Sequence, residues 1–105
     1  MPYTRGFINE RDLEIHFDKH GAEFGAADKE QYRALADEFL GAPPNENTRD
    51  CTRARDGAMV RVNIVTEAIG ILRRNGTIAT YYSKKNRNRR RYPSILDYWR
   101  EVCVK

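Results

Sequence analysis

The sequence predicts an α+β domain in which two N-terminal helices pack on an antiparallel sheet of three to four strands, with a C-terminal helix. Three observations support this prediction. Apolar residues recur at helical spacing in the first 40 residues, short alternating or β-branched runs follow between positions 59 and 82, and helical spacing returns after position 93. A chain of 105 residues has room for one core, so we expect a single domain over residues 1–105.

Both N-terminal helices have recognisable start and stop signals. Asn9 is a good N-cap for a first helix that runs to about Gly21 with one apolar side. Asp28 is a good N-cap for a second helix, in which apolar residues recur every three or four positions. Gly41, closely followed by two prolines, ends the second helix because proline cannot continue it.

The middle of the chain has the pattern of strands. Three runs alternate or are rich in β-branched residues: 59–65, 68–72 and 77–82. Asn75 and Gly76 lie between the second and third runs and form a strong hairpin signal, because a tight hairpin turn needs residues that adopt positive φ. A weaker run at 51–55 can add a fourth strand. Pro93 or Ser94 then opens a final helix with an apolar face.

The positive charge is concentrated in the segment 84–91 (KKNRNRRR), the basic segment. The formal net charge of the chain is +4, yet this segment holds six basic residues and no acidic one, so the other 97 residues hold 13 basic and 15 acidic side chains. Such a segment either contacts a polyanion or is a solvated basic loop. No run approaches the ~18 apolar residues of a membrane span, and the N-terminus lacks the apolar stretch of a signal peptide, so we expect no membrane partner.

The two cysteines give no sign of a metal site. Cys51 and Cys103 lie 52 positions apart, with no metal-ligand spacing around either. We favour free thiols packed against apolar neighbours, and a disulfide that ties the end of the chain to its middle remains the alternative.

Both histidines lie in one five-residue stretch of the first predicted helix. His16 and His20 are four residues apart, so a helix places them one above the other. This spacing can bind zinc, but Phe17 stands where a zinc protease has glutamate and no further ligand is evident, so we expect neither a metal nor a cofactor. The alternatives are two histidines that merely cap or pack the helix, and acid/base chemistry in which Lys19 stabilises an anion.

A basic segment, several tyrosines and a histidine beside a lysine are the groups that RNA cleavage requires. The RNA 2′-hydroxyl supplies the nucleophile, so the protein must remove its proton, stabilise charge at phosphorus and help the 5′-oxygen leave. DNA lacks this hydroxyl and usually needs metal-activated water, which makes a DNase the less favoured prediction.

The residues around His20 resemble a family motif. Residues 19–25, KHGAEFG, are similar to the KHxxDFG stretch around the catalytic histidine of the colicin D tRNA ribonuclease domain. Further features of that family follow in the same order, as far as Tyr82: Arg55, Gly57, the run 59–62, Asn63, Thr66, the run 69–72, Asn75 with Gly76, and Thr80. The resemblance implies the fold of colicin D, barnase and RelE-type ribonucleases, with helices on one face of the sheet and the RNA site on or beside the opposite face.

The resemblance also implies a role for each matching residue. His20 becomes the general acid/base, and Lys19 a cation near the scissile phosphate. Thr80 matches a serine that can bond a phosphate oxygen, and Tyr82 stands where the family has tryptophan and can stack on a base. His16 has no counterpart in the family, but it can supply a second proton transfer if it faces the same site.

Eight basic residues are predicted to contact RNA. Six belong to the basic segment and two precede it: Lys84, Lys85, Arg87, Arg89, Arg90 and Arg91, with Arg55 and Arg61. For Arg55 and Arg61, solvation of a sheet edge is an equal alternative.

These features and the resemblance together predict a metal-independent endoribonuclease toxin domain that cleaves tRNA in or near the anticodon loop and leaves a 2′,3′-cyclic phosphate. The resemblance implies delivery as the C-terminal part of a secreted protein, action in the cytoplasm of a target bacterial cell, and an acidic cognate immunity protein or antitoxin as partner. Two alternatives remain: a non-catalytic RNA-binding module, and a RelE-like toxin that cuts mRNA on the ribosome.

Overall fold

The computed structural model describes residues 3–105, so the first two residues of the predicted domain lie outside it. It confirms the α+β class, with helices first, a four-stranded antiparallel sheet next and a helix at the end. In chain order the elements are α1 (Glu10–His20), a short 3₁₀ helix η1 (Gly21–Phe24), α2 (Lys29–Gly41), β1 (Thr48–Thr52), β2 (Met59–Asn63), β3 (Ala68–Leu72), β4 (Ile78–Ser83) and α3 (Ile95–Val104). Within residues 3–105, no helix is long and apolar enough to cross a membrane.

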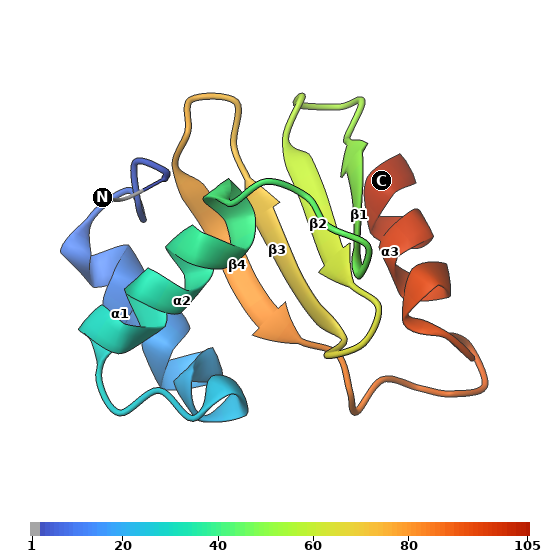
Figure 1. The fold of residues 1–105 in the computed structure, drawn as a ribbon, viewed down its shortest axis with the longest axis horizontal. Helices are drawn as coiled ribbons and strands as arrows, with labels where there is room; N and C mark the ends of the chain where they lie inside the picture. The colour runs from blue at the N-terminus through green and yellow to red at the C-terminus, as the bar shows by residue number, and fades with distance from the viewer. Residues whose placement is uncertain (1–2) are drawn as a thin grey trace.

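The four strands form a meander in which each strand pairs with the next one along the chain (Figure 1). Strands β1 and β4 are therefore the two edges of the sheet. Helix α1 lies beside β4, and α2 crosses β3 and β4 on one face. Helix α3 packs against β2. A fourth strand is present, but the predicted bounds of 51–55 are wrong: β1 begins three residues earlier and ends at Thr52, and residues 53–55 belong to the turn that follows it.

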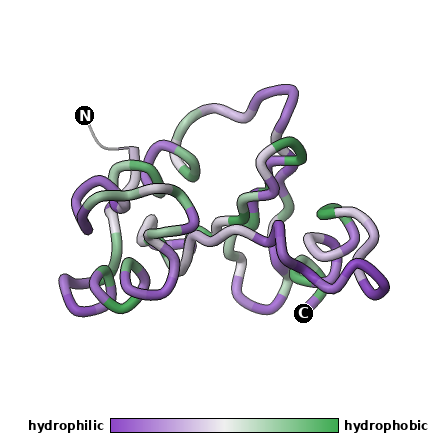
Figure 2. The backbone as a smooth tube through the Cα atoms, turned by 90° about the horizontal axis from the view of Figure 1, so that it is seen from below, coloured by the Kyte–Doolittle hydropathy of each residue, from purple (hydrophilic) through white to green (hydrophobic). Residues whose placement is uncertain are grey.

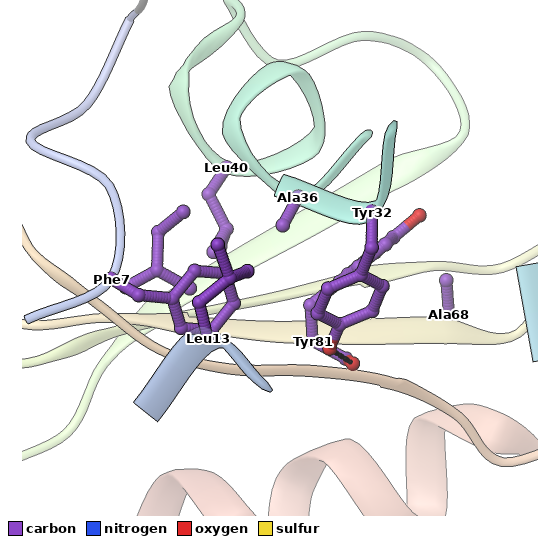
Figure 3. Packing of buried hydrophobic residues seen from close by; sticks show 8 residues of the cluster. Phe7, Leu13, Tyr32, Ala36, Leu40, Ala68 and Tyr81 are labelled. Carbon is purple, nitrogen blue, oxygen red and sulfur yellow. Dashed lines mark hydrogen bonds between the residues drawn. The ribbon is translucent and has the colours of Figure 1, made fainter. Parts of the chain in front are cut away.

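The first apolar core lies between helices α1 and α2 and the sheet. Helix α2 supplies Tyr32 and Leu40 and α1 supplies Leu13, all almost fully buried. They form one cluster with Tyr81 of β4, whose ring centroid lies 5.9 Å from that of Tyr32 (Figure 3). The Tyr32 hydroxyl donates a hydrogen bond to the backbone carbonyl of Tyr81 at 2.5 Å, and the Tyr81 ring stacks on Phe24 with centroids 4.0 Å apart. Burial of these large side chains holds both helices on β4, at about 1.5–3 kcal/mol for each.

The second apolar core lies on the opposite face of the sheet, under helix α3. It consists of inward-facing valines and isoleucines: Val60, Val62, Ile69, Ile71 and Ile95. The indole N–H of Trp99 donates to the carbonyl of Val60 at 3.1 Å, which fixes α3 across β2. Helix α3 thus packs mainly over β2 on the face on which the resemblance places the RNA site.

The predicted helix and turn signals are confirmed. Asn9 and Asp28 each accept a hydrogen bond from the backbone N–H three residues further on, both at 2.8 Å. Ser94, not Pro93, is the N-cap of α3. Gly76 adopts a φ of 89°, in the left-handed region that the hairpin turn between β3 and β4 requires.

The two cysteines form a disulfide, which corrects the prediction of free thiols. Cys51 lies in β1 and Cys103 in α3, with Cα atoms 6.2 Å apart, within the range that a disulfide can bridge. These elements are far apart in the sequence, and they meet because α3 folds back across β2 next to the edge strand. The closed loop contains the other three strands of the sheet.

We expect the disulfide to stabilise the fold mainly by restricting the unfolded chain. A loop of 52 residues corresponds to about 4 kcal/mol in the chain-entropy model, and native bridges typically contribute about 2–4 kcal/mol. The Cys51→Ser/Cys103→Ser double variant should therefore lose about 2–4 kcal/mol of unfolding free energy in urea titrations. A reductant should lower the unfolding free energy of the unsubstituted protein to that of the double variant, and leave the unfolding free energy of the variant unchanged. Equal urea midpoints for the oxidised parent and the variant would contradict a stabilising bridge.

Candidate active site

Four of the five predicted catalytic residues meet beside the edge strand β4. On α1, His16 and His20 lie one turn apart, with ring centroids separated by 6.3 Å. His16 Nδ1 is 3.4 Å from Thr80 Oγ1, and the centroids of the His20 and Tyr82 rings are 5.6 Å apart. All four side chains are half-buried. Two positions of a helix and two of a strand thus form one site, the histidine site (His16, His20, Thr80 and Tyr82).

A bulge in β4 turns Thr80 toward the histidines. The pairing of β3 with β4 shifts between Leu72 and Ile71, so Ala79 is an extra residue with no partner on β3. A bulge bends its strand and changes the direction in which a side chain points. Ala79 accordingly packs with the second core, while Thr80 reaches the histidine site on the same face.

Each histidine has a carboxylate partner. His20 Nδ1 is 2.9 Å from Glu23 Oε2, and the other oxygen of Glu23 accepts a hydrogen bond from the Ser83 N–H at 2.7 Å. Glu23 therefore orients the His20 ring and ties η1 to the end of β4. His16 Nε2 is 3.5 Å from Asp12 Oδ1, and the second oxygen of Asp12 is buried without a hydrogen-bond partner.

Burial lowers the pKa of His16 below its usual value of 6.5, because the charged ring loses hydration. The Asp12 carboxylate opposes this shift. The positive charges of His20, Lys19 and Arg73 strengthen it. Lys19, the fifth predicted catalytic residue, is exposed and makes no ion pair within residues 3–105, so it acts on the site through its charge. His16 is consequently neutral at pH 7 and can accept a proton.

A second tyrosine, Tyr98 from α3, extends the histidine site. The hydroxyl oxygens of Tyr82 and Tyr98 are 2.9 Å apart, and the two rings are nearly perpendicular. The ammonium of Lys84 lies 5.0 Å from the centre of the Tyr98 ring and 5.8 Å from that of Tyr82. Burial raises the pKa of Tyr82, and the hydrogen bond with Tyr98 raises it further, so its hydroxyl stays protonated at neutral pH. The pair therefore offers a hydroxyl donor and a ring surface beside His20.

Two residues predicted to contact RNA are structural instead. Arg61 is 5% exposed, and its guanidinium binds both oxygens of Asp50, at 2.7 and 2.9 Å, and two backbone carbonyls at the end of α2. Arg87 is 8% exposed, forms an ion pair with Glu67 and donates to three backbone carbonyls. Protein acceptors occupy both guanidiniums, so neither is available to RNA, contrary to the prediction.

The other basic residues of the prediction remain accessible. Five are exposed: Arg55, Lys85, Arg89, Arg90 and Arg91. Arg91 is partly neutralised by Glu101 at 2.9 Å. The basic segment lies on the outside of the molecule between β4 and α3, where Figure 2 shows it as a hydrophilic stretch. Because β4 leads directly into it, these cations begin next to the Tyr82 end of the histidine site.

The sequence reasoning did not identify Asp12, Glu23 and Tyr98 as site residues. Asp12 lies four residues before one histidine and Glu23 three residues after the other, so helical spacing offers a signal for both. Tyr98 reaches the site because α3 packs over the sheet, and no local pattern indicates this. Within residues 3–105, no group of three or more histidine, cysteine, aspartate and glutamate side chains is arranged to hold a metal ion.

Comparisons with known proteins do not assign the chain to a family. No protein-family model matches it, and no curated protein matches it. The chemistry of the site therefore has to be inferred from its own residues. Two imidazoles, hydroxyl donors and cations around one surface suit a reaction that moves two protons and builds up negative charge.

The lowered pKa of His16 can be measured directly. In NMR titrations the His16 ring should show a midpoint below 6.5, and Asp12→Asn should lower it further, because the carboxylate that favours the charged ring is removed. The folded protein holds this proton less tightly than the unfolded chain, so His16 should also reduce stability as the pH falls below about 6.5. A midpoint at or above 6.5 would show that the ring is not held in its neutral form.

Arg87 and Arg90 provide a matched pair of variants within the basic segment. Arg87→Ala leaves the partly buried Glu67 without its cation and should cost on the order of 3 kcal/mol of unfolding free energy. Arg90 is exposed and makes no ion pair within residues 3–105, so Arg90→Ala should change stability by less than about 0.5 kcal/mol. Urea titrations of both variants check this difference, and equal stabilities would rule out a structural role for Arg87.

Proposed function

We propose that this chain is a metal-independent endoribonuclease of the toxin class that cleaves tRNA in or near the anticodon loop. The observation that carries the proposal is the pair of histidines, each next to a carboxylate, beside a threonine and a tyrosine of β4. Cleavage by the RNA 2′-hydroxyl needs two proton transfers and stabilisation of charge at phosphorus, and the site contains groups for both.

In this proposal His16 is the general base. It is neutral at pH 7, so it can take the proton of the 2′-hydroxyl as the 2′-oxygen attacks phosphorus. His20, oriented by Glu23, is the general acid and gives a proton to the 5′-oxygen as the bond from phosphorus to that oxygen breaks. The products are a 2′,3′-cyclic phosphate and a 5′-hydroxyl. Proton exchange with water then restores both imidazoles for the next cycle.

Polar groups around the histidines meet the charge that develops on the phosphate. Thr80 Oγ1, 3.4 Å from His16, can donate to a non-bridging oxygen. Lys19, next to His20 in the chain, supplies a cation. Tyr82, with its hydroxyl held by Tyr98, can stack on a base or donate a hydrogen bond.

The narrower parts of the proposal rest on the resemblance to colicin D-like toxin domains. These parts are tRNA as the substrate, delivery as the C-terminal part of a secreted protein, action in the cytoplasm of a target bacterial cell, and an acidic immunity protein or antitoxin as partner. The charge distribution supports an acidic partner, because the exposed cations of the basic segment begin beside the histidine site. A partner that neutralised them would also keep RNA away.

His20→Ala should reduce cleavage of total tRNA in EDTA by at least about 100-fold, because a positioned acid or base contributes about 10²–10⁴-fold. His16→Ala should lose activity to a similar extent. Ile15→Ala, at a position on the same helix that is 44% exposed and uncharged, is the matched control and should keep full activity. Circular dichroism should show the same fold in all three variants. Undiminished cleavage by folded His20→Ala would overturn the assignment of this residue.

The ends of the cleaved RNA distinguish the nuclease from its alternatives. A 2′,3′-cyclic phosphate on purified tRNA supports the proposal. Salt-dependent RNA binding without any cleaved product supports the RNA-binding module instead. Cleavage confined to mRNA on the ribosome supports the RelE-like toxin.

A further inference from the structure

A pocket lined by arginines lies at the end of the sheet where the turn between β1 and β2 stands beside the turn between β3 and β4 (Figure 1). It encloses about 500 Å³. Each turn contributes two arginines to the lining of this arginine pocket: Arg53 and Arg55 from the first turn, Arg73 and Arg74 from the second.

The arginine pocket opens on the same face of the sheet as the histidine site. Ala58 and Ala79 line it, and both pack with the second core under α3. Ala79 is the bulge residue and directly precedes Thr80, so the wall of the pocket continues along β4 into the histidine site. Arg73 is also close enough to His16 for its charge to lower the pKa of that histidine.

Positive charge exceeds negative charge in the arginine pocket. Its single carboxylate, Asp56, is bound by Arg53 through hydrogen bonds of 3.1 and 2.7 Å, which contribute most to holding its pKa at about 2. Arg55 is exposed, with its guanidinium 3.8 Å from the same carboxylate. Arg73 donates to two uncharged oxygens, and Arg74 makes no ion pair or hydrogen bond within residues 3–105. Three guanidiniums therefore have no carboxylate of their own.

The turn between β1 and β2 leaves room for the side chain of Arg74. Gly57 has a φ of 72°, and a Cβ at this position would lie 2.4 Å from Arg74 Cδ. The lack of a side chain at Gly57 therefore lets the Arg74 stem lie across the turn.

We infer that the arginine pocket is a second phosphate-binding site, which holds a phosphodiester of the RNA strand next to the one that is cleaved. This inference rests on the proposed function. Guanidinium groups bind phosphate oxygens through paired N–H bonds and remain charged at any physiological pH. The strand of RNA then follows β4, from the arginine pocket through the histidine site to the basic segment, so a good substrate extends beyond the cut on both sides.

Binding is best measured in the non-cleaving His20→Ala protein, by fluorescence anisotropy with a labelled single-stranded RNA of about ten nucleotides. Arg74→Gln in this background should weaken binding about tenfold and reduce the slope of log affinity against log salt concentration by about one. Arg33→Gln removes the same charge from α2, which packs on the other face of the sheet, and should leave both quantities unchanged.

In the active protein, Arg74→Gln should raise KM for the long RNA about tenfold with little change in kcat, and leave KM for a dinucleotide substrate unchanged. If Arg74→Gln binds the RNA as tightly as Arg33→Gln does, the arginine pocket is not a phosphate site. If binding depends on Arg74 but the parent protein cuts no RNA, the phosphate site stands and the proposed nuclease function fails.

Discussion

The directions of the side chains along β4 link the first core to the histidine site. Tyr81 points into the core under α2, where it stacks on Phe24 and accepts the hydroxyl of Tyr32 at its carbonyl. Tyr82 points to the opposite face and meets Tyr98. Because strand side chains alternate, a one-residue slip in the pairing of β4 would exchange the two tyrosines between core and site. The aromatic packing around Tyr81 thus holds the helices in place and also sets the register of the site.

The two histidines occupy different surroundings although they lie on one helix. Asp12, on the same helix, reaches His16 at ion-pair distance, yet burial and nearby cations decide the protonation of that ring. Glu23 comes from the short helix after α1 and is itself anchored to the end of β4, so His20 is positioned from the sheet. Neighbouring titratable groups in unlike environments can divide the roles of base and acid between them.

Local signals predicted the elements well, because caps and tight turns satisfy backbone groups within a few residues. Grouping the histidines with Thr80 and Tyr82 depended on the family resemblance, which supplied a tertiary arrangement that periodicity does not contain. The wrong predictions for Arg87 and Cys51 share a physical cause. An arginine in a basic run has the same local pattern whether it faces water or, like Arg87, an acid 20 residues away. The partner of Cys51 depends in the same way on how the last helix crosses the sheet.

The bond between Cys51 and Cys103 also changes the topology of the chain. With the bridge closed, β2, β3, β4 and the basic segment belong to a covalent ring of residues 51–103, and residues 1–50 and 104–105 lie outside it. Denaturation opens the packing of such a ring but cannot turn it into one extended strand. The oxidised chain would therefore stop at its ring when it is threaded through a pore that is wide enough for only one polypeptide strand. The reduced chain has no ring and could pass through such a pore.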